Sequence, residues 1–125
     1  MKVGLCGVFV WLIVAACSAD GPFDGKWTAH VIRPTAGPQD LTITLSSNGG
    51  KVTGSLAIEG SAASPIEWGM IKSDLIAFKV KMPFQNGTQT FVYLGKLDGD
   101  RIAFGRRPED LTLGVLVEFT AMRAK

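Results

Sequence analysis

The sequence holds few residues of the kind that enzymes use for proton transfer or nucleophilic attack. It has one histidine, His30, and no serine or cysteine within a nucleophile motif. General acid–base chemistry needs two titratable groups within hydrogen-bond reach, and no such pair can be assembled from the sequence. An imidazole on the outer face of a strand is the simpler interpretation of His30. We therefore expect a protein that is not an enzyme.

One short motif could bind a metal ion, the Asp98-Gly99-Asp100 triplet. A calcium loop of the EF-hand type needs more oxygen ligands at fixed spacing than this triplet supplies. Asp and Gly are also the residues that tight turns prefer. The triplet is better explained as a hairpin turn, and we expect neither a metal nor a cofactor.

The charges do not indicate a nucleic-acid partner. Lys2 is the only basic residue before Cys17, so 12 Lys and Arg face 11 Asp and Glu in the chain that follows, a net charge of +1. The two signs are mixed along this stretch, and no basic stripe alternates with aromatic residues. Nucleic-acid-binding domains usually show such a stripe.

A hairpin is written twice in the sequence. Residues 69–78 and 95–104 align at an offset of 26, with a glycine at the start, an aspartate in the middle and Ile-Ala-Phe at the end of each. Each copy has the pattern of a strand end, a polar turn and a new strand with alternating apolar residues. A repeated strand–turn–strand unit indicates an antiparallel meander.

The period-two patterns predict eight strands and no helix beyond the first 19 residues. The clearest is Leu41-Thr42-Ile43-Thr44-Leu45. The full set of expected strands is 27–33, 41–45, 51–58, 66–71, 75–82, 89–97, 101–105 and 115–123. We expect them to close into an all-β, eight-stranded antiparallel up-and-down barrel, because closure removes exposed strand edges.

The connections alternate between short and long. Tight turns are expected at 47–50, 72–74 and 98–100, whereas the other connections are longer and carry prolines. In an up-and-down barrel, alternate connections lie at the same end. The sequence thus predicts one closed end made of tight turns and one open end ringed by larger loops.

Five residues at the open end are candidates for ligand binding: Arg33, Glu67, Phe84, Arg106 and Arg107. A few polar groups around an apolar interior are typical of a small-ligand site, so we expect a small, largely apolar molecule there. The simpler alternative is that these loops are merely solvated.

The volume of the barrel interior decides between a ligand site and solvated loops. Large side chains expected inside could fill the barrel (Trp27, Phe78, Met82, Phe91, Tyr93, Phe104, Phe119), whereas inward glycines could leave room (Gly54, Gly69, Gly95).

A second surface suggests a function of another class. If Gly69 and Ile71 face inward, then Ile66, Trp68 and Met70 form an apolar row on the outside. Such a row could recognise a protein or a glycan of the cell envelope, with the barrel interior packed solid. The alternative is a β-bulge at Gly69 that turns Trp68 inward.

Residues 1–19 have the pattern of a secretory signal peptide, expected as a helix, with Lys2 ahead of an apolar run too short to span a membrane. A short tether at 20–24 and a barrel domain at 25–125 would follow. Val14-Ala15-Ala16-Cys17 resembles a bacterial lipobox, which would make Cys17 a lipidation site and the sole membrane contact. The alternative is ordinary cleavage before Asp20. Either one predicts export, to a lipid anchor in the cell envelope or to the periplasm or exterior.

The region 25–123 resembles the calycin group, the lipocalin and avidin-like barrels. Gly25-Lys26-Trp27 is similar to the Gly-x-Trp at the start of a lipocalin's first strand, and Arg123 matches the basic residue near the end of the last strand. The resemblance implies that Arg123 packs over Trp27 at the closed end. It does not reach a ligand, because none of the side chains by which avidin-like barrels hold biotin can be placed here.

Overall fold

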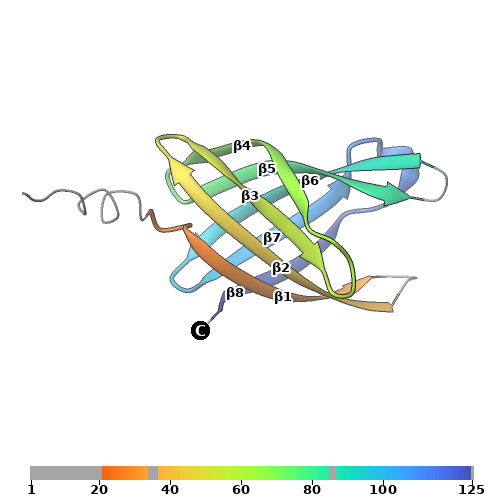
Figure 1. Cartoon of the computed structure of the whole chain (residues 1–125), viewed down its shortest axis with the longest axis horizontal. Helices are drawn as coiled ribbons and strands as arrows, with labels where there is room; N and C mark the ends of the chain where they lie inside the picture. The colour runs from red at the N-terminus through yellow and green to blue at the C-terminus, as the bar shows by residue number, and fades with distance from the viewer. Residues whose placement is uncertain (1–20, 34–36, 85–86, 125) are drawn as a thin grey trace, which may run out of the picture.

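The computed structural model describes residues 21–33, 37–84 and 87–124. The expected all-β fold is confirmed: eight antiparallel strands form a closed barrel in which β1 pairs with β8 (Figure 1). The strands are β1 (Gly25–Arg33), β2 (Gly37–Asn48), β3 (Lys51–Ile58), β4 (Ser64–Lys72), β5 (Leu75–Phe84), β6 (Gly87–Asp98), β7 (Arg101–Pro108) and β8 (Val117–Arg123). A short 3₁₀ helix, η2 (Leu111–Leu113), lies between β7 and β8. The expected signal peptide lies outside the described residues.

Alternation of apolar and polar residues explains which side chains face the interior. In β2, for example, Leu41, Ile43 and Leu45 are buried, and the residues between them are not. Several strands run further than the sequence predicts, β2 most of all, because pairing continues through prolines near strand ends. Pro38 lies opposite Ile32 at the end of the β1–β2 ladder, where a missing donor costs little.

Each tight turn of the closed end, on the left of Figure 1, accepts a backbone hydrogen bond from the end of a later strand. The amide of Ile71 donates to Gly50 O (2.8 Å), that of Leu97 to Asp74 O (2.8 Å) and that of Arg123 to Asp100 O (2.9 Å). Each even-numbered strand from β4 to β8 is thus bonded, at its last residues, to the turn before it. This ring satisfies backbone groups that strand ends would otherwise leave unpaired.

Residues 21–24 pack against the closed end, which differs from the short tether that we expected. Phe23 is fully buried, and its carbonyl accepts a hydrogen bond from Trp27 Nε1 (2.9 Å). The Asp24 carboxylate accepts from the amides of Ser47 (2.7 Å) and Gly21 (3.0 Å). The segment therefore acts as a plug for this end of the barrel.

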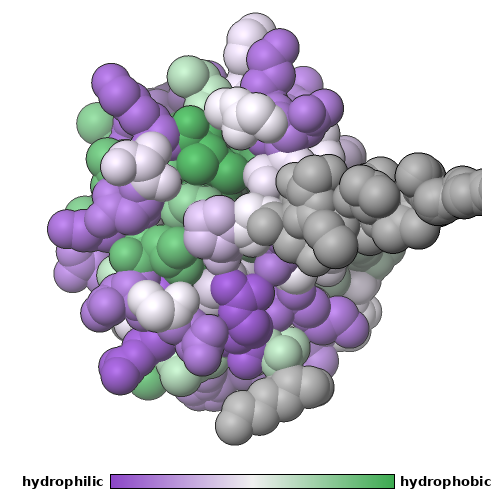
Figure 2. Space-filling model, turned by 90° about the vertical axis from the view of Figure 1, so that its left-hand side faces the viewer, coloured by the Kyte–Doolittle hydropathy of each residue, from purple (hydrophilic) through white to green (hydrophobic). Residues whose placement is uncertain are grey.

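Arg123 packs over Trp27, as the resemblance to lipocalins implied. Its guanidinium carbon lies 4.3 Å from the centroid of the indole ring. The guanidinium also donates to the carbonyls of Asp24 (2.8 Å) and Pro22 (2.8 Å). Figure 2 looks onto this end, where hydrophilic and hydrophobic side chains are interspersed on the part of the surface that is coloured.

Four aromatic rings fill the middle of the barrel. Phe78 stacks on Tyr93 with centroids 5.0 Å apart, and Phe104 stacks on Phe119 at 5.3 Å. The expected room at the inward glycines is not found, because a Cβ on Gly54, Gly69 or Gly95 would lie under 3.0 Å from a neighbouring heavy atom. A Cβ on Gly95 would lie 2.8 Å from a ring carbon of Phe104, so this glycine lets the ring approach the strand.

Within the described residues, no helix combines the length and apolar character needed to cross a membrane.

Candidate ligand-binding site

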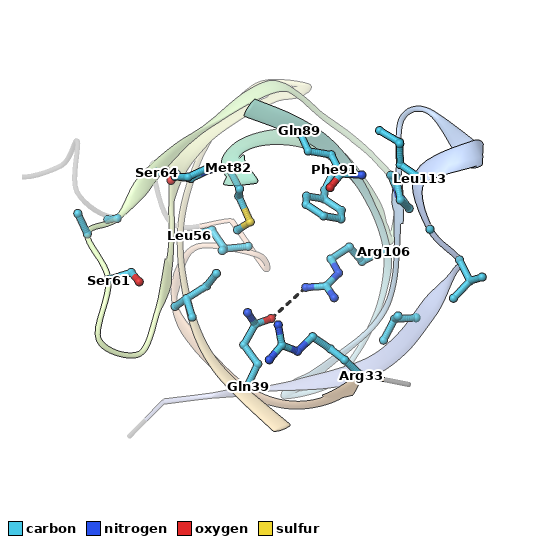
Figure 3. A pocket seen from close by; sticks show the side chains of 18 residues that line it. Arg33, Gln39, Leu56, Ser61, Ser64, Met82, Gln89, Phe91, Arg106 and Leu113 are labelled. Atoms are coloured by element: carbon cyan, nitrogen blue, oxygen red, sulfur yellow. Dashed lines mark hydrogen bonds between the residues drawn. The ribbon is translucent and has the colours of Figure 1, made fainter. Parts of the chain in front are cut away.

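The open end contains a cavity of about 760 Å³. Its walls come from strand ends around the barrel, from the β3–β4 loop and from the segment after η2 (Figure 3). Most of the lining is apolar, including Leu56, Ile58, Met82, Phe91, Val115 and Val117. The barrel is therefore filled in its middle and hollow towards its loops.

Strand periodicity explains why the cavity begins where it does. Inward positions on β6 are, from the open end, Gln89, Phe91, Tyr93 and Gly95. Gln89 and Phe91 line the cavity, whereas Tyr93 belongs to the aromatic cluster below it. The interior therefore changes from packed to open between two successive inward residues of β6, Tyr93 and Phe91.

Arg106 is the main polar group of the cavity. It is an inward residue of β7 and only 7% exposed. Its Nη1 donates to Gln39 Oε1 (3.1 Å), and its guanidinium carbon lies 5.2 Å from the centroid of the Phe91 ring. Figure 3 shows the guanidinium pointing into the cavity between these two side chains.

No acidic group balances this charge within the described part of the chain. The ion pairs found there are His30–Asp40, Lys79–Glu109, Lys81–Glu67 and Arg123–Asp100, and none includes Arg106. The cavity lining contains Arg33 and Arg106 but no described Asp or Glu. The cavity is thus an apolar space with positive charge on one wall.

Tyr93 lies directly across the ladder from Arg106. Its hydroxyl is buried and has no hydrogen-bond partner among the described residues. Burial raises the pKa of the phenol, and the nearby positive charge of Arg106 partly opposes this rise. The side chain is therefore held as a neutral phenol.

The structure brings two of the five open-end candidates together. Arg33 and Arg106 both line the cavity. Glu67 does not: it lies 3.9 Å from Lys81 in an ion pair. Arg107 does not either, because successive strand residues face opposite sides, and its Nη1 donates to the carbonyl of Pro108 (3.3 Å). The side chain of Phe84 lies outside what the structure describes.

Sequence reasoning missed Gln39 and Gln89 as members of the site. Gln39 lies outside the expected strand 41–45, although it continues the inward series Leu41, Ile43 and Leu45 by one step. Gln89 lies in an expected strand, two residues from the inward Phe91, and this spacing predicts that Gln89 also faces the interior. Extending each alternating pattern to the end of its strand would have found both.

The outer apolar row is only partly present. Ile66 is buried (8% exposed), so its expected outward position is wrong, whereas Trp68 and Met70 are 77% and 63% exposed. The cause is a bulge in the β4–β5 ladder between Glu67 and Met70, which shifts the inward phase from Ile66 to Gly69 and Ile71. The alternative of a bulge that turns Trp68 inward is wrong in its effect, because the bulge is present but Ile66 lies inside and Trp68 outside.

Apart from Arg33 and Arg106, no described Asp, Glu, His, Lys or Arg lines the cavity. His30 is exposed, with Nδ1 2.6 Å from Asp40 Oδ1, and this hydrogen bond is the main cause that lowers the pKa of Asp40. No group of three or more His, Cys, Asp or Glu is close enough to hold a metal ion in the part of the chain that the structure covers. The arrangement at the open end is suited to holding a molecule by apolar contact and one cationic wall.

Comparison of the chain with protein-family models, with curated proteins and with solved structures gave no match.

Proposed function

We propose that this protein is an exported binding protein for a small, largely apolar molecule, which enters through the open end of the barrel. The observation that carries the proposal is the apolar cavity of about 760 Å³. Ligand sites typically measure about 300–1,000 Å³ and combine an apolar lining with a few polar groups. We propose no catalytic role, cofactor, metal or nucleic-acid partner.

The two ends of the barrel support the same proposal. At the closed end, Phe23 and the Trp27–Arg123 stack occupy the interior, so a ligand would meet packed side chains there. At the other end, the cavity opens between the loops. An eight-stranded barrel that is packed at one end can hold one small ligand at the other, and we propose that this barrel functions as lipocalins do.

Export and anchoring complete the proposal. Residues 1–19 would direct export, and Cys17 would carry a lipid if the lipobox is used. Because Gly21 to Asp24 pack on the closed end, an anchor at Cys17 would hold that end nearest the membrane. The open end would then face away from the membrane and receive its ligand from the surrounding fluid.

Fluorescence titration with N-phenylnaphthylamine, a neutral apolar probe, tests the proposal. We expect saturable binding by the purified chain with one probe per barrel. Val117→Trp, which fills the cavity from β8, should weaken binding about tenfold or more. Glu118→Trp is the matched control, because Glu118 is exposed on the same strand. An absence of binding to the parent, or equal binding by both variants, would contradict the proposal.

A second candidate function is recognition of an envelope glycan or protein by the outer surface around Trp68. Trp68 is exposed and has a positive φ of 55°, which is rare for a bulky residue and is found at functional sites. An exposed indole can stack on a sugar ring. In sedimentation with purified cell-wall glycan, this candidate predicts that Trp68→Ala loses binding and that Ile32→Ala, at an exposed residue of β1, keeps it. Binding unchanged by Trp68→Ala would exclude it.

A further inference from the structure

The guanidinium of Arg106 is buried inside the cavity without a negative partner among the residues that the structure describes. A charged side chain in an apolar environment is costly unless it is paired and hydrogen-bonded. Its hydrogen bond to Gln39 reaches a neutral acceptor, and its guanidinium also lies over the face of the Phe91 ring. Guanidinium groups carry five donors in a planar fork, so this one has donors left for a ligand.

The charged side chains that line the cavity are both positive. Arg33 lines the rim and Arg106 the wall, and the lining contains no described Asp or Glu. Next to Arg106, the hydroxyl of Tyr93 is buried without a described partner. No described residue of the lining carries a negative charge that would attract a cation. Such a site favours an anionic group over a neutral or cationic one.

We propose that the ligand is an amphiphilic carboxylate, an inference that rests on the proposed binding function. Its carboxylate pairs with the Arg106 guanidinium, and its apolar part lies against Leu56, Met82 and Val117 on the remaining walls. A planar guanidinium and a planar carboxylate match in a bidentate geometry. A single buried guanidinium at the wall also suits a head group with one negative charge.

Displacement of N-phenylnaphthylamine by matched competitors tests this inference on the parent chain. Dodecanoate, dodecanol and dodecylamine share one tail and differ in head group. We expect dodecanoate to displace the probe at concentrations about 10- to 100-fold lower than dodecanol does, the range that a charge-assisted hydrogen bond gives. Dodecylamine should be the weakest of the three. Equal displacement by the acid and the alcohol would overturn the inference and leave the proposed function standing.

Two variants assign the preference to Arg106. Arg106→Gln should remove the advantage of dodecanoate and leave dodecanol unchanged, and Arg106→Lys should restore part of it. Arg107→Gln is the matched control, because it removes the same charge one residue away on the outer face. A preference kept in a folded Arg106→Gln, or lost in Arg107→Gln, would contradict the assignment. If Arg106→Gln fails to fold, the test uses the ratio of the displacing concentrations of dodecanoate and dodecanol. This ratio is then compared between the parent chain and Arg106→Lys, in which the preference for dodecanoate should be smaller.

A parent chain that does not bind the probe at all would instead count against the proposed function, so the two failures are distinguishable.

Discussion

Arg106 shows how one residue changes the character of the cavity. The walls around it are mostly apolar, and a barrel lined only by such residues would select ligands by shape alone. Under the proposed function, the buried guanidinium would also fix the orientation of the ligand, because the ligand must place an acceptor against it to gain the full interaction. The contacts with Gln39 and Phe91 hold the side chain in place within the cavity.

Tyr93 provides a direct readout of this environment, because it is the only tyrosine in the sequence. We expect ultraviolet titration to show a pKa above the ordinary value of about 10, since burial disfavours the phenolate. Arg106→Gln should raise this pKa further by removing a positive charge, and Arg107→Gln should leave it unchanged. An ordinary pKa in the folded parent would mean that the phenol is hydrated.

The same shift predicts how stability depends on pH. A group whose pKa is raised by folding contributes stability that is present below its unfolded pKa, about 10 here, and is lost as the pH rises through the folded pKa. The free energy of unfolding should therefore fall in strongly alkaline solution. In Tyr93→Phe, which has no phenol to titrate, this part of the fall should be absent.

At the scale of elements, the two copies of the repeated hairpin have different residues at the same position of the turn. Ser73 and Gly99 occupy equivalent positions, with φ values of 59° and 65°. Glycine adopts this left-handed conformation without steric cost, whereas other residues lose about 1–2 kcal/mol. The repeat therefore predicts that the β4–β5 turn holds strain that the β6–β7 turn does not.

A reciprocal pair of substitutions tests this turn. Ser73→Gly should raise the free energy of unfolding by up to about 1 kcal/mol, and Gly99→Ser should lower it by about 1 kcal/mol. A Cβ at Gly99 would meet no heavy atom within 4 Å, so backbone conformation is the only cost there. Urea denaturation measures both changes. Shifts of the same sign in both variants would contradict the equivalence of the turns.

The closed end depends on contacts between β1, β8 and the plug segment at residues 21–24. Arg123→Ala removes the stack on Trp27 and two hydrogen bonds to plug carbonyls, so it should lower the free energy of unfolding by about 2 kcal/mol. Arg101→Ala, at an exposed residue of the same end, should change it by less than about 0.5 kcal/mol. Equal effects on urea denaturation would show that Arg123 is an ordinary surface charge.

For the whole molecule, sequence reasoning reached the architecture because alternation and turn residues are local signals. Eight strands, antiparallel closure and the difference between the two ends could all be predicted, and the Trp27–Arg123 contact followed from resemblance. Ile66 was misplaced because the strand's phase shifts at a bulge, which depends on pairing with β5. The burial of Phe23 was missed because a residue outside a strand has no periodicity to place it.

The site was harder to predict than the fold because a cavity is a property of packing. The sequence named Arg33 and Arg106 but also Glu67 and Arg107, since position near a loop does not say which way a side chain faces. Whether the interior was filled could not be decided by counting large residues. The four central aromatic rings pack against one another in the middle of the barrel, so they do not extend into the open end (Phe78, Tyr93, Phe104 and Phe119).

Methyl NMR during titration of the purified chain with dodecanoate tests the central claim most directly. Ligand in the cavity should shift the methyl signals of Leu56, Met82 and Val117 until one equivalent is bound. The methyl signals of Met70 and Met122, which are exposed on the outside, should stay in place. Shifts confined to these outer methyls, or none at any ligand concentration, would contradict a binding site inside the barrel.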